Sequence, residues 1–158
     1  METEPQPSDA SGALITLRHA KYLNLESYRR NGTGVRTPIW FAASPGDFTD
    51  PTMEKLYVYS IADSGKAKRI RRCGRIRIAA CDLRGHATAP WTDAFAEVAT
   101  ADEFELGMRL LDRKYFPWKQ LLNFSAMQFR RHKRIVLVIR LVSTVNADHH
   151  IETATSKP

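Results

Sequence analysis

The segment from Ser64 to Arg77 contains a hydroxyl, two glycines and seven basic side chains, along a short predicted helix and the start of the next predicted strand. Ser64 is a good N-cap residue, and Lys66 and Arg69 lie three positions apart, on one face of the first turns. The first N–H groups of a helix have no internal partner and carry partial positive charge. These groups together predict an anion site, for which phosphate is the natural occupant. A capped helix with a solvated basic face is the alternative reading of the same residues.

The positive charge of the chain is concentrated in this segment. The 158 residues carry a formal net charge of +7, and the stretch Lys66–Arg77 alone holds seven Lys or Arg and no acid. The remainder is therefore nearly neutral, which favours a local binding site over a uniformly basic surface.

A second basic cluster, Arg130–Arg134, makes a nucleic-acid-binding module the main alternative. Tyr57, Tyr59 and Trp40 would then serve as stacking platforms for bases. Isoleucines interleave with the basic residues of the first segment at core spacing, however, so half of that charge would point to other surfaces. Nucleic acid is thus the less favoured ligand.

Several other chemistries lack their motifs. Ala67 follows Gly65-Lys66, and position 60 is Ser, so the segment is not a Walker A loop. No His or Cys pair shows metal-ligand spacing, so no metal site is predicted. No nucleophile motif or paired acids appear, and the catalytic residues stay unknown. Cys73 and Cys81 form no CxxC pair and are typical of reduced thiols in a cytoplasmic protein.

The elements that must position the anion site indicate an α+β fold. Residues 1–12 and 147–158 are predicted to be disordered tails around one domain, 13–146. Five strands with one interposed helix, then helices and a sixth strand, suggest a small six-stranded antiparallel barrel with a few short helices. The longest aliphatic run is too short for a membrane span. Strands are predicted over 22–28, 35–43, 56–60, 75–83, 91–100 and 133–145, and helices over about 14–21, 62–73, 101–116 and 117–129.

Two local signals refine the start of this barrel. Asn31-Gly32 predicts a tight type I′ turn between the first two strands. Pro38 has no N–H, so it is expected at a sheet edge, at a bulge or beside a bound ligand.

Three stretches in order resemble the pyridoxamine 5′-phosphate oxidase-like family of split β-barrels, in its branch of FMN-binding and deazaflavin-dependent oxidoreductases. They are the hairpin YRRNG leading to VRTPIWF, the stretch SGKAKRIR after the third strand, and RIRIAACDLRG. The resemblance covers about residues 14 to 145. It implies a homodimer with two cofactor sites at the subunit interface.

The resemblance also implies which residues hold the cofactor. The strand Thr37–Trp40 would run along the flavin ring, and Tyr59–Arg69 would receive the phosphate, with Lys66 as the main cation. The predicted cofactor-binding residues are Thr37, Pro38, Ile39, Trp40, Tyr59, Ser60, Ser64, Gly65, Lys66 and Arg69.

The resulting hypothesis is an oxidoreductase that transfers hydride between the cofactor and a small organic substrate. The cofactor carries the chemistry, which fits the missing acid–base motif. FMN and the deazaflavin coenzyme F-420 share a ribityl phosphate, so both remain candidates. The anionic glutamate tail of F-420 would suit Arg71, Arg72 or the Arg130–Arg134 cluster, which favours the deazaflavin. A cofactor or haem-like ligand bound without turnover is a further alternative.

Overall fold

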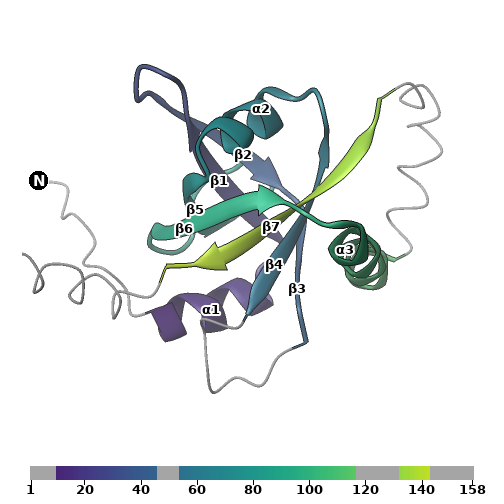
Figure 1. Ribbon diagram of the computed structural model, residues 1–158. Helices are drawn as coiled ribbons and strands as arrows, with labels where there is room; N and C mark the ends of the chain where they lie inside the picture. Colours follow the sequence, from purple (N-terminus) through teal and green to yellow (C-terminus); the bar gives the residue numbers. More distant parts are fainter. Residues whose placement is uncertain (1–9, 46–53, 117–131, 143–158) are drawn as a thin grey trace, which may run out of the picture.

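The computed structural model describes residues 10–45, 54–116 and 132–142, and they form one curled antiparallel sheet with three helices (Figure 1). The strand order across the sheet is β2-β1-β5-β6-β7-β4-β3. The elements are α1 (Ala10–His19), β1 (Tyr22–Tyr28), β2 (Gly34–Ile39), β3 (Phe41–Ala43), β4 (Lys55–Ile61), α2 (Gly65–Arg72), β5 (Arg75–Cys81), β6 (Thr92–Val98), α3 (Ala101–Tyr115) and β7 (Arg134–Leu141).

The two outermost strands of the sheet are neighbours in sequence. β2 ends at Ile39 and β3 begins at Phe41, so Trp40 alone carries the chain from one edge of the sheet to the other. Since one residue spans only about 3.5 Å, the two edges must meet there. The sheet is therefore curled into a barrel that closes at Trp40.

The barrel is open beyond this point. β3 pairs with β4 only from Leu56 to Val58, which leaves the end of β4, Tyr59 to Ile61, without a strand on that side among the described residues. β2 likewise pairs only with β1 in the described part of the chain. These free edges define the opening of the split barrel, and α2 begins four residues after the end of β4.

The core lies inside the curl. Alternate residues of the strands point inward, for example Leu25 of β1, Val58 of β4 and Ile78 of β5, all fully buried. Burying each such side chain contributes about 1.5–3 kcal/mol. α2 covers one end of this core with Ala67 and Ile70.

α3 instead packs on the outside of the sheet, against β3, β4 and β7, and α1 lies at the end of the barrel away from α2 (Figure 1). The capping box of α3 joins Thr100 and Glu103, and Tyr57 of β4 is buried beneath this helix with Val136 and Val138. β7 is therefore buried on both faces, as its continuous apolar run predicts.

The six-strand prediction is wrong, because the predicted strand 35–43 is two strands. Trp40 interrupts it at the crossing between the sheet edges, and the sheet has seven strands. The antiparallel α+β architecture and the other described strands and helices are confirmed within a few residues. Pro38 lies on an edge strand, as expected. The helix predicted over 117–129 falls outside the described residues.

The type I′ turn is also wrong in detail. The Gly32 N–H donates to the Arg29 carbonyl oxygen at 3.0 Å, so Arg30 and Asn31 are the central residues of that turn. Within this turn only Gly32 has a positive φ, of 84°, and the φ of Asn31 is negative. The Asn31 side chain accepts the Thr33 N–H at 3.1 Å. The longer loop needs only one left-handed residue, for which glycine is suited.

Candidate functional site

The N-terminus of α2 lies next to the free end of β4. Ser64 caps the helix, and its Oγ accepts the Ala67 N–H at 3.2 Å. Its hydroxyl lies 3.1 Å from that of Ser60, the second-last residue of β4, which is buried. The N–H groups of Gly65 and Lys66 belong to the first turn, where no intrahelical carbonyl is available. Two hydroxyls and free helical N–H groups therefore converge at the opening of the barrel.

Lys66 adds a positive charge at this place. Burial and the nearby charge of Arg69 lower the pKa of its ammonium group to about 8. Within the described residues, no carboxylate pairs with Lys66. A half-buried cation without a counter-ion is costly, and a bound anion would relieve that cost.

The side chain of Arg69, three residues after Lys66, points toward the sheet. Its Nε donates to Ser27 Oγ at 2.8 Å, and Ser27 is fully buried near the end of β1. One terminal nitrogen of Arg69 lies 2.9 Å from where a Cβ of residue 65 would stand. The absence of a side chain at Gly65 thus leaves room for the guanidinium against the first turn. Burial and the charge of Arg29 lower the pKa of Arg69.

The predicted ring-binding strand lies on the other side of the opening. Thr37 and Ile39 share the inward face of β2 with Leu25 and Leu23 of β1, whereas Pro38 points outward and is exposed. Neighbouring residues of a strand point to opposite faces. The strand therefore presents Thr37 and Pro38 on different sides of its free edge.

Trp40 is held by α3. Its ring stacks on Tyr115 with centroids 4.7 Å apart and planes 14° apart. The Tyr115 hydroxyl lies 2.7 Å from the Lys21 carbonyl oxygen and 3.0 Å from that of Phe41, and it accepts the Phe41 N–H at 3.1 Å. The Tyr115 hydroxyl therefore links the chain just before β1 to the chain just after Trp40.

The structure brings together five of the ten predicted site residues, and their roles remain predictions. Tyr59 is 37% exposed on the outer face of β4, opposite to Ser60. The five gathered at the α2 N-terminus are Ser60, Ser64, Gly65, Lys66 and Arg69.

Sequence reasoning missed the partners that position these groups. Ser27 lies on the inward face of β1 with Leu23 and Leu25, and a polar residue at such a position could have indicated a buried hydrogen-bond acceptor. Tyr115 offered no signal beyond its place on the apolar face of α3, because its hydroxyl partners are backbone groups far away in sequence.

No protein-family model matches the chain, and no curated protein matches it in sequence. None of the described helices is long and apolar enough to cross a membrane.

The fold is shared with several solved structures at low sequence identity. The chain is similar to Atu2129 of Agrobacterium tumefaciens, a protein of unknown function, with 12% identity and a TM-score of 0.60, over 89% of this chain and 56% of that one. It is similar to a Listeria innocua protein provisionally named pyridoxamine 5′-phosphate oxidase, with 14% identity and a TM-score of 0.50, over 85% and 98%. An F420 reductase gives 17% identity and a TM-score of 0.51, over 84% and 94%.

These likenesses define the fold class. The chain has the split-barrel fold of pyridoxamine 5′-phosphate oxidase-like proteins, which confirms at the level of the fold the resemblance drawn from the sequence. It spans about half of Atu2129 and nearly all of the Listeria protein.

Proposed function

We propose that the chain binds the phosphate of a flavin-type cofactor, FMN or the deazaflavin F-420, at the N-terminus of α2. The observation that carries this proposal is Lys66, a half-buried cation with no carboxylate partner in the described part of the chain, in the first turn of a helix whose N-terminus also carries two hydroxyls. A dianionic phosphate accepts hydrogen bonds from all of these groups and neutralises the lysine.

The same proposal assigns the rest of the cofactor to the edge of β2. The ring would lie along the free edge of β2, lined by Thr37, Pro38, Ile39 and Trp40, and the stack with Tyr115 would keep Trp40 in place. When bound, the cofactor supplies the hydride transfer to or from a small organic substrate. The protein binds, orients and shields it.

The homodimer is part of the same proposal. The opening between β2 and the end of β4 is bounded on this chain by free strand edges, so a partner subunit could complete the cofactor's enclosure. Proteins named as an oxidase and as an F420 reductase share the fold, which supports an oxidoreductase.

The substitution Lys66→Ala tests the phosphate site. One charge-assisted contact contributes about 1.5–3 kcal/mol, so FMN affinity should fall about 10- to 150-fold, measured by quenching of flavin fluorescence. Arg113→Ala is the control, because it removes one positive charge from an exposed position of α3, away from α2. Unchanged affinity in Lys66→Ala, or an equal loss in both variants, would contradict the assignment.

Two other functions make different predictions. A nucleic-acid-binding module would bind oligonucleotides with an affinity that falls steeply with salt, and would not retain a flavin. A protein that binds its cofactor without turnover would retain the chromophore but would not exchange hydride with any substrate.

A further inference from the structure

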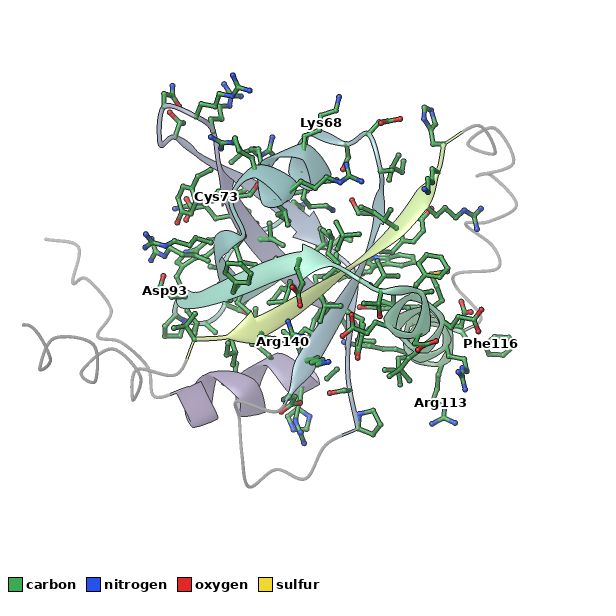
Figure 2. All side chains as sticks on the ribbon, viewed as in Figure 1. Lys68, Cys73, Asp93, Arg113, Phe116 and Arg140 are labelled. Atoms are coloured by element: carbon green, nitrogen blue, oxygen red, sulfur yellow. The ribbon has the colours of Figure 1, made fainter. Side chains whose placement is uncertain are left out.

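A second cationic site lies along α2, between this helix and the β1–β2 hairpin. A hollow of about 350 Å³ is lined by five basic side chains from the β1–β2 hairpin and from α2. In Figure 1 the hairpin and α2 lie side by side, and in Figure 2 Lys68 points away from the sheet on the outer side of α2. The lining residues are Arg29, Arg30, Lys68, Arg69 and Arg72.

The part of the chain that the structure describes does not neutralise these five charges. Among the described residues, no carboxylate forms an ion pair with any of them. Acids are paired elsewhere: Glu26 contacts Arg36 and Arg77, and Glu103 contacts Lys55. Mutual repulsion of five cations destabilises the free protein unless an anion is present.

Two of the five side chains are held in place. Arg69 donates to Ser27 Oγ, and a terminal nitrogen of Arg72 donates to the Tyr28 carbonyl oxygen at the end of β1. The two acceptors, Ser27 and Tyr28, come just before the turn that carries Arg29 and Arg30. An anchored guanidinium loses less entropy when it binds an oxyanion, so these contacts prepare the hollow for a ligand.

The hollow is not the phosphate site described above. Lys66, Ser60 and Ser64 do not line it, and Arg69 is the residue common to both. A single phosphate carries a charge of about −1.5 to −2 near neutral pH. It would leave most of the five cations without a partner, so the charge of the hollow matches an anion with several negative groups.

We propose that this hollow binds a multiply charged oxyanion, a diphosphate or a short run of carboxylates, separately from the single phosphate at Lys66. The arginine fork matches both phosphate and carboxylate in a bidentate manner. The group could belong to a free polyphosphate, to the pyrophosphate of a dinucleotide, or to the glutamate chain of a coenzyme. This inference does not depend on the proposed redox function.

The test is titration calorimetry of the full chain with inorganic pyrophosphate and with inorganic phosphate, at equal ionic strength. The double variant Arg30→Gln/Lys68→Gln removes two charges of the hollow, and both side chains are exposed. The control Arg109→Gln/Arg113→Gln removes two charges from exposed positions of α3, away from α2. We expect pyrophosphate to bind more tightly than phosphate, and the hollow variant to weaken pyrophosphate binding about tenfold or more.

The phosphate site gives the second readout. The hollow variant should leave FMN affinity within about twofold of the wild-type value. Lys66→Ala should instead weaken FMN binding and leave pyrophosphate affinity nearly unchanged. Titrations with FMN, a flavin dinucleotide and F-420 then identify the source of the oxyanion, since only a ligand that uses the hollow should bind the hollow variant more weakly. If pyrophosphate is the one ligand that binds this variant more weakly, the natural ligand is a free polyphosphate.

Three results would overturn the proposal. Pyrophosphate could bind no more tightly than phosphate, or the control variant could lose as much affinity as the hollow variant. A single-stranded oligonucleotide that binds far more tightly than pyrophosphate, with a steep salt dependence, would show instead that the hollow is part of a nucleic-acid surface. The first two results do not bear on Lys66, and the FMN affinity of Lys66→Ala is measured separately, so the failure of this proposal and that of the flavin site can be told apart.

Discussion

The affinity of the protein for FMN should fall as the pH rises through about 8, because Lys66 must be protonated to hold the phosphate. In the free protein, burial and the charge of Arg69 lower the pKa of Lys66 to about 8. The phosphate of FMN loses its second proton near pH 6 and is dianionic over this whole range. Lys66 is therefore the group whose titration should govern binding between pH 7 and pH 9.

The size of the effect follows from the fraction of Lys66 that is protonated. With a pKa of about 8, this fraction is about 0.9 at pH 7 and about 0.1 at pH 9. If the complex requires the ammonium form, FMN affinity should fall about tenfold over these two units. The bound phosphate should also raise the pKa of Lys66, so binding near pH 8.5 should take up protons.

The assay is flavin fluorescence quenching at pH 7, 8 and 9 and constant ionic strength. Lys66→Arg is the matched variant, since a guanidinium stays charged throughout and should make FMN affinity nearly independent of pH. Riboflavin, which lacks the phosphate, should show no such dependence with the wild-type chain. An affinity that is flat from pH 7 to 9, or that falls equally with Lys66→Arg, would refute the reasoning.

Three further substitutions test the elements around the site. Ser64→Ala should cost about 1 kcal/mol of stability in urea unfolding because the Ala67 N–H loses its cap, and unchanged stability would contradict the capping role. Gly107→Ala should cost about 1–3 kcal/mol, since its Cβ would stand 2.8 Å from the Tyr57 ring; a neutral effect would mean that this ring moves freely. Tyr115→Phe should lower the free energy of unfolding by about 1–3 kcal/mol, because the buried Phe41 N–H loses its acceptor, and an unchanged thermal midpoint would argue against that bond.

The local elements were predictable because each depends on neighbours in sequence. The alternation of Leu23, Leu25 and Ser27 specifies β1, and the Ser64 cap followed by basic residues specifies α2. Patterns of this kind report which face of an element is buried, and the structure agrees with them.

The closure of the barrel was harder to predict from the sequence. Residues 35–43 read as one continuous strand, because nothing local in Trp40 shows that the chain leaves one sheet edge and joins the other. That crossing depends on the register of strands distant in sequence. The seventh strand therefore appears only in three dimensions.

The candidate site divides in the same way. Ser64, Gly65 and Lys66 could be grouped from helix physics alone, since they share one helix start. The contact of Arg69 with Ser27 and the meeting of Arg29 with α2 join segments about forty residues apart. No spacing rule within a single element predicts such a contact.

The most direct test of the central claim is an absorbance spectrum of the purified protein, taken after addition of FMN or of the deazaflavin and passage through gel filtration. A chromophore that stays with the wild-type protein, and is lost with Lys66→Ala, is the result predicted here, and its band would show which cofactor is held. A wild-type protein that retains neither cofactor at micromolar concentration would contradict the proposed function.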